Sequence, residues 1–122
     1  MSKHGSAVLK MLAAYKEAAL FSSTDKNGVP LDRKYSEANI IASTNIKMIA
    51  DVVKFYTDNV DDIGTRFEEA GADFWLTRNR EGSGFWDGDW PEPQAARLTK
   101  AAHAFGKMSL DVSRGKIYGS SG

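Results

Sequence analysis

One short segment holds the densest group of aromatic residues in this chain, and it constrains the fold more than any other feature. Residues 73–87 contain four of the 13 aromatic residues, separated into two pairs by a Gly-Ser-Gly run at residues 82–84. Aromatic runs on either side of a glycine-rich turn are typical of a β-hairpin. We therefore expect strands at residues 73–79 and 85–87, which would form the nucleus of a sheet.

Helical periodicity dominates the chain before this segment. Residues 6–21 have apolar side chains at spacings of three and four, which predicts a helix. Turn-forming residues then predict a loop over residues 22–34. Ser36 is expected to cap a second helix that runs to about Asn59, because its hydroxyl can accept a hydrogen bond from a free backbone N–H.

The apolar stripe of the second helix is broad. A main set of apolar residues recurs every three or four positions, and a second set widens the stripe. The main set is Ile46, Ile49, Val53, Tyr56 and Val60, and the widening set is Met48, Val52 and Phe55. A stripe of this width predicts a central core helix that contacts more than one neighbour.

The remaining elements complete an α+β pattern. A short helix is expected at residues 61–70, ending at Gly71, and another helix at residues 94–105. Residues 107–112 and 116–118 predict a second hairpin. The predicted fold class is therefore α+β: a helical N-terminal half, then a β-hairpin, a helix and a second β-hairpin, which together form a small antiparallel sheet covered by helices.

The chain length predicts one domain. We expect residues 1–118 to form a single α+β domain with a modest core. Residues 119–122, Gly-Ser-Ser-Gly, are expected to be a flexible tail or a cloning remnant.

Composition narrows the classes of function. The 16 basic and 16 acidic residues balance, so no global field attracts DNA or an anionic membrane. The absence of cysteine excludes disulfides, thiolate metal sites and a cysteine nucleophile, and it fits a reducing cytosol. Residues 7–21 carry too many charges for a signal-peptide core or a membrane span. We therefore expect a cytoplasmic protein with no membrane partner.

The aromatic segment also carries a resemblance. The run Asp-Phe-Trp-Leu-Thr-Arg-Asn at residues 73–79, followed by Gly-Ser-Gly-Phe-Trp-Asp at residues 82–87, resembles a signature of small tailed-phage and prophage proteins. The likeness covers roughly residues 51–118. It implies a phage-encoded accessory protein that acts in the cytoplasm of a bacterial host. That family has no established activity, so the resemblance implies no catalytic residues.

The chain departs from that family at two positions. Family members tend to have a histidine just before the Asp-Phe-Trp run and another in the turn. Here these positions are Ala72 and either Arg80 or Glu81. A function that depends on those histidines is therefore not expected in this protein.

The leading hypothesis is a non-enzymatic protein that binds a host or phage macromolecule, most simply another protein, and that can form a homo-oligomer. Neither a cofactor nor a metal is expected. Aromatic rings and arginines are favoured as binding anchors because they bury a large area and make directional contacts. The candidate binding residues are Trp75, Arg78, Asn79, Arg80, Trp86, Asp87 and Trp90.

Other interpretations of the same residues stay open. Trp75 and Trp86 could stack nucleobases at about 1–3 kcal/mol each, with Arg78 and Arg80 on the phosphates of a single strand. The simpler alternative is that the rings fill a small core. A metal-dependent hydrolase or a virion component is a further alternative, and the hydrolase would use Asp73, Asp87, Asp89 and His103.

Overall fold

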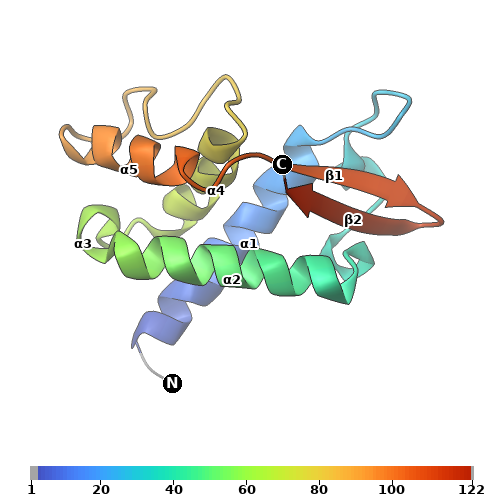
Figure 1. Ribbon diagram of the computed structural model, residues 1–122, viewed down its shortest axis with the longest axis horizontal. Helices are drawn as coiled ribbons and strands as arrows, with labels where there is room; N and C mark the ends of the chain where they lie inside the picture. The colour runs from blue at the N-terminus through green and yellow to red at the C-terminus, as the bar shows by residue number, and fades with distance from the viewer. Residues whose placement is uncertain (1–2, 122) are drawn as a thin grey trace.

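Helices form most of this α+β protein, and a two-stranded antiparallel sheet follows them at the C-terminal end (Figure 1). The computed structural model describes residues 3–121. The helices are α1 (Lys3–Ser22), α2 (Ala42–Asp58), α3 (Val60–Ile63), α4 (Phe67–Arg78) and α5 (Gln94–His103). Two 3₁₀ helices, η1 (Leu31–Arg33) and η2 (Glu37–Asn39), precede α2, and the strands are β1 (Met108–Ser113) and β2 (Lys116–Ser121).

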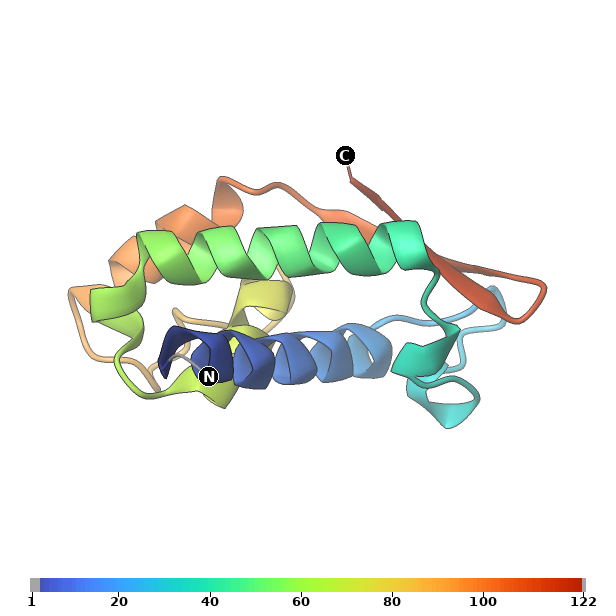
Figure 2. The same cartoon turned by 90° about the horizontal axis from the view of Figure 1, so that it is seen from below.

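The long helices α1 and α2 lie in different layers and cross each other (Figures 1 and 2). Helix α4 packs most closely on α1, because Gly71 of α4 lies against the backbone of Met11. An added Cβ at Gly71 would overlap the carbonyl oxygen of Met11. The close approach of α1 and α4 therefore requires glycine at this position.

Aromatic rings form the centre of the core. Phe55 of α2 and Phe74 of α4 stack with their ring centroids 4.1 Å apart. Phe85 also stacks on Phe55 at 5.7 Å, and Phe105 meets Phe74 edge-on at 4.9 Å. Offset and edge-on pairs of this kind add about 0.5–1.5 kcal/mol beyond the burial of their area. Three of the four rings of the aromatic segment, Phe74, Trp75 and Phe85, are thus buried in the core, whereas Trp86 is exposed.

The expected hairpin at residues 73–87 is wrong. Residues 73–78 belong to helix α4, and residues 85–87 lie in turns. The buried positions Ala70, Phe74 and Arg78 recur every four residues, which is a helical period. Packing of this face decides the conformation over the strand preference of the phenylalanine and tryptophan side chains.

The expected helix at residues 61–70 is also wrong. Helix α3 ends at Ile63, and Gly64 follows with φ 62°. Helix α4 begins at Phe67 and continues through Gly71, which is therefore not a helix stop. The sheet has two strands rather than four, since the first hairpin is absent.

Other expectations are confirmed. The first, second and last long helices form at α1, α2 and α5. The second hairpin forms as β1 and β2, with Val112 paired to Ile117. Ser36 does cap a helix, but it caps η2 rather than α2.

The C-terminal residues 119–121, expected to be a tail, belong to strand β2. Gly119, Ser120 and Ser121 pair with Leu110, Ser109 and Met108. The backbone N–H of Gly119 also donates to Thr44 Oγ1 at 2.9 Å. Residue 122, the last of the expected tail, lies outside the described residues.

Within residues 3–121, no helix combines the length and the hydropathy that a membrane crossing requires.

Candidate functional site

Trp75, the first of the expected binding residues, is buried. Its ring meets that of Tyr15 edge-on at 5.4 Å, and its indole Nε1 donates to Ser22 Oγ at 2.8 Å. The second expected stacking ring, Trp86, is 52% exposed. The two-ring platform proposed for nucleobases is therefore not formed.

Arg78 is also buried, and it organises a polar network inside the core. Its Nη1 donates to Asp51 Oδ2 at 2.7 Å and to the hydroxyl of Tyr15 at 3.0 Å. Its Nε and Nη2 donate to the carbonyl oxygens of Gly106 and Phe105. Every contact of this guanidinium is internal, so Arg78 does not face a ligand.

The network perturbs Tyr15. Burial raises the pKa of the Tyr15 hydroxyl to about 12, while the charge and the hydrogen bond of Arg78 act in the opposite direction. The phenol is therefore neutral at physiological pH and acts as a structural hydrogen-bonding group.

Trp90 is held by charged residues at the edge of the core. Its indole Nε1 donates to Asp73 Oδ2 at 2.7 Å, and the guanidinium of Arg66 lies over its ring at 3.9 Å. Burial raises the pKa of the Asp73 carboxyl above its ordinary value, opposed by the hydrogen bond from Trp90. Trp90 is thus a buried anchor of the loop between α4 and α5.

Asn79 caps the end of α4 and joins it to the sheet. Its Nδ2 donates to the carbonyl oxygen of Trp75 at 3.0 Å, and its Oδ1 accepts from the backbone N–H of Met108 at 2.9 Å.

Of the seven expected residues, Arg80, Trp86 and Asp87 are exposed. Asp87 Oδ2 accepts from the backbone N–H of Gly84, which shapes the turn.

The residues of the hydrolase alternative do not form a metal site. Within the described part of the chain, no group of three or more histidine or acidic side chains is arranged to hold a metal ion. His103 lies on α5, where burial and then Arg80 lower its pKa. Asp73 is instead engaged by Trp90.

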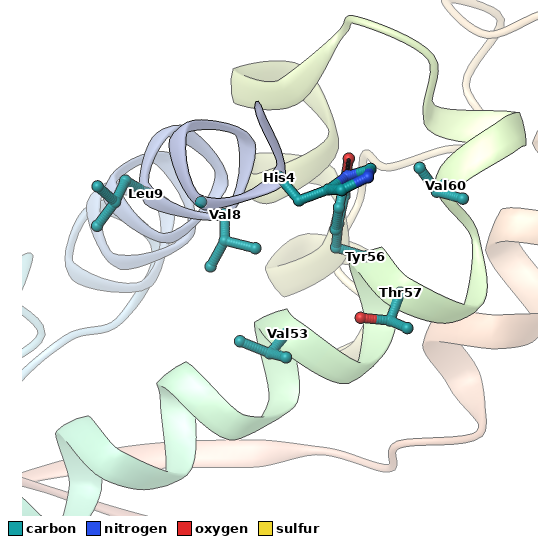
Figure 3. Close-up of a pocket in the computed structure, with 8 residues that line it drawn as sticks. His4, Val8, Leu9, Val53, Tyr56, Thr57 and Val60 are labelled. Atoms are coloured by element: carbon teal, nitrogen blue, oxygen red, sulfur yellow. Dashed lines mark hydrogen bonds between the residues drawn. The ribbon is translucent and has the colours of Figure 1, made fainter. Parts of the chain in front are cut away.

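The surface that stands out lies elsewhere, between α1 and α2. An open groove of about 720 Å³ separates the N-terminal half of α1 from the C-terminal end of α2 (Figure 3). Its walls are almost entirely apolar and include Val8, Leu9, Val53, Tyr56, Thr57 and Val60. His4 Nδ1 lies 2.7 Å from the hydroxyl of Tyr56 and fixes the start of α1 beside the end of α2.

The apolar surface continues along α2 beyond the groove. Ile46, Ile49 and Val53 are 66%, 37% and 41% exposed, and Leu9 of α1 is 56% exposed. These residues and the groove together form what we call the α1–α2 surface. Exposed apolar patches beside a groove mark sites of contact with other proteins or ligands.

This surface corrects the expectation for α2. The widening set of the stripe, Met48, Val52 and Phe55, is the set that faces the core. Most of the main set faces outward, and only Tyr56 of that set is buried. The sequence contains the signal, because two apolar rows on one helix require two apolar environments, and the core supplies only one.

Comparisons with protein-family models, curated proteins and solved structures found no match to this chain.

Proposed function

We propose that this chain is a non-enzymatic accessory protein that binds another protein through the α1–α2 surface. The observation that carries the proposal is the exposed row of Ile46, Ile49 and Val53, which leads directly into the apolar groove. Grooves between helices accept the apolar face of a partner helix, whose anchoring side chains recur every three or four residues. The proposed occupant is therefore an amphipathic helix of a protein.

The chemistry of the rest of the molecule supports binding over catalysis. The polar residues first expected to meet a ligand, above all Arg78 and Asn79, are engaged in contacts that hold the core and the sheet together. The groove itself exposes almost no polar atoms. Such a surface suits recognition by burial of apolar area.

The cellular context of the proposal rests on the motif at residues 73–87 alone. Its resemblance to small phage proteins favours a phage-encoded accessory protein in a bacterial host, with a host or phage protein as partner. The surface would then serve assembly with that partner rather than a reaction.

A labelled amphipathic helical peptide, with leucines at positions i, i+3, i+4 and i+7, is a suitable probe of the surface. Fluorescence anisotropy should show binding to the wild type and at least roughly tenfold weaker binding to Val53→Asp, since a carboxylate there must lose its water when the groove fills. Phe21→Asp is the matched control, because Phe21 is 70% exposed and lies outside the α1–α2 surface.

The control variant should bind the probe as the wild type does. The proposal fails if both variants lose binding equally. It also fails if the wild type binds neither the probe nor a second copy of itself.

A further inference from the structure

We propose that the partner on the α1–α2 surface is a second copy of this chain, with the two α2 helices antiparallel across a twofold axis near Val53. This inference rests on the proposed function, because it names the occupant of the same surface. A twofold interface uses one patch twice, so the patch must be complementary to itself. Both the shape and the charge of α2 meet that condition.

The shape is complementary because the two halves of α2 differ. The N-terminal half carries the projecting side chains of Ile46 and Ile49, and the C-terminal end borders the groove. Ile46 lies seven residues before Val53, and Val60 lies seven residues after it. Helix α2 ends at Asp58, and Val60, which lines the groove, is the first residue of α3. In an antiparallel pair centred on Val53, each Ile46 therefore lies just past the C-terminal end of the partner's α2, where the groove is, and the ridge of one copy fills the groove of the other.

The charges are complementary in the same arrangement. Lys47, Lys54 and Asp58 are spaced by seven and four residues, so they follow one edge of the apolar row. Lys54 Nζ lies 2.9 Å from Asp58 Oδ2 on this exposed edge. A twofold axis perpendicular to the helices and in the plane of the interface brings this edge against the same edge of the partner, in the opposite direction.

The position of each charge then selects the register. Lys47 lies six residues before Val53, and Asp58 lies five residues after it, so each Lys47, which already lies 3.1 Å from Asp51 of its own chain, also lies near the partner's Asp58. A pair centred three residues earlier, on Ala50, would instead bring Lys47 against the partner's Lys54, which like charges disfavour. In the favoured register the two Lys54 side chains lie near the axis, each beside Asp58 of its own chain.

Sedimentation and light scattering of the full chain, from micromolar to millimolar concentration, measure the association. The wild type should form a dimer. Val53→Asp and Ile46→Asp should each weaken it at least tenfold, since Val53 lies at the axis and Ile46 fills the groove. Phe21→Asp should dimerise like the wild type. Thermal unfolding of each variant shows that the substitution has left the fold intact, as expected at exposed positions.

A charge exchange tests the register. Lys47→Glu alone and Asp58→Lys alone each place like charges at both contacts of a homodimer, and each should dissociate. Each also breaks an ion pair within the chain, Lys47–Asp51 or Lys54–Asp58, so thermal unfolding must show that the monomer of each variant stays folded. When the two variants are mixed, both contacts join opposite charges, and heterodimers of wild-type affinity should form. Homodimers of either variant as tight as the wild type would overturn the register.

The outcomes separate this inference from the proposed function. The chain could stay monomeric at millimolar concentration and still bind the helical probe at a surface that Val53→Asp blocks. This result would overturn the inference that the partner is a second copy, and it would leave the proposed function standing. A dimer that survives both Val53→Asp and Ile46→Asp forms elsewhere and overturns the inference. If Val53→Asp also leaves probe binding unchanged, the proposed function falls as well.

Discussion

The guanidinium of Arg78 joins residues that are far apart in the chain. It binds Asp51 of α2, Tyr15 of α1 and the carbonyl oxygens of Phe105 and Gly106 after α5. A buried ion pair of this kind contributes little compared with apolar side chains of the same volume. The loss of one member is costly, however, because the other charge remains buried without its partner.

Replacing Arg78 should therefore destabilise the protein strongly. Arg78→Met is expected to lower the free energy of unfolding by about 3–5 kcal/mol, because it leaves Asp51 buried with only the half-exposed Lys47. Urea denaturation measures the change. Lys54→Met is the control, since it breaks an exposed ion pair and should cost about 0–1 kcal/mol. Similar small losses of stability in both variants would show that Asp51 can stay buried without Arg78 at little cost.

Tyr15 should make stability depend on alkaline pH. Its pKa is about 12 in the folded state and near 10 in the unfolded chain, so the folded state holds the proton more tightly. This contribution is complete below pH 10 and is lost as the pH rises to about 12. The wild type should lose up to about 3 kcal/mol more than Tyr15→Phe over this range.

At pH 8 the same Tyr15→Phe variant should be less stable than the wild type by about 1 kcal/mol, because Arg78 loses an acceptor. Urea denaturation at a series of pH values measures both effects. Parallel stability curves for the two proteins across the alkaline range would contradict the assignment to Tyr15.

Among the elements, α4 depends most on a single backbone contact. Gly71 in its first half lies against the backbone of Met11 in α1. Intrinsic helix preference and packing therefore make opposite demands at this position. Alanine is better than glycine in a helix by about 1 kcal/mol, but here its Cβ would meet backbone that cannot move aside.

Gly71→Ala should consequently destabilise the protein by about 1–3 kcal/mol or more, as overpacking does. Thermal unfolding followed by circular dichroism measures the change. Gly82→Ala is the matched control, because a Cβ at Gly82 meets no atom within 4 Å and its backbone is not in the left-handed region. Stabilisation by Gly71→Ala would show that the α1–α4 contact is looser than described.

The sequence specified some elements better than others, and the reason is local. The strand β1 alternates buried Met108 and Leu110 with exposed Ser109 and Asp111, so its period is visible without the rest of the fold. In α4, strand-favouring aromatic residues occupy helical positions, and the helix is decided by the face it buries against α1. That contact is not visible in the segment itself.

The candidate site was misplaced for a related reason. Trp75 and Arg78 have the chemistry of binding residues, but nothing in their own segment shows that Tyr15 and Asp51 lie beside them. The double apolar row of α2 was visible, yet which row would face outward depends on the packing of the other helices. The sequence indicates which apolar and aromatic residues are important here, but it does not show whether each side chain faces the core or the surface.

At the scale of the whole molecule, strand β2 closes the fold over the start of α2. The backbone N–H of Ile41 donates to the carbonyl oxygen of Ile117 at 3.1 Å, and Gly119 donates to Thr44. Ile117 is fully buried. The sheet therefore fixes the segment that leads into α2, although it has only two strands.

Deletion of residues 119–122 should lower the free energy of unfolding by about 1–2 kcal/mol, because it removes the bond to Thr44 and the pairing opposite Met108 and Leu110. Urea denaturation measures the loss. A double substitution, Ser120→Ala with Ser121→Ala, keeps the backbone pairing and should change stability by less than about 0.5 kcal/mol. An unchanged stability after deletion would mean that these residues are the dispensable tail that their composition suggests.

The buried pair of Arg78 and Asp51 also has a consequence for the evolution of this chain. Since either charge alone is costly inside the core, a lineage cannot exchange one of them without passing through a weakened intermediate. The two positions should consequently change together or not at all. A distant relative would then be recognised by a matched basic and acidic residue at these two helical positions, even after the aromatic run that first draws attention has been replaced.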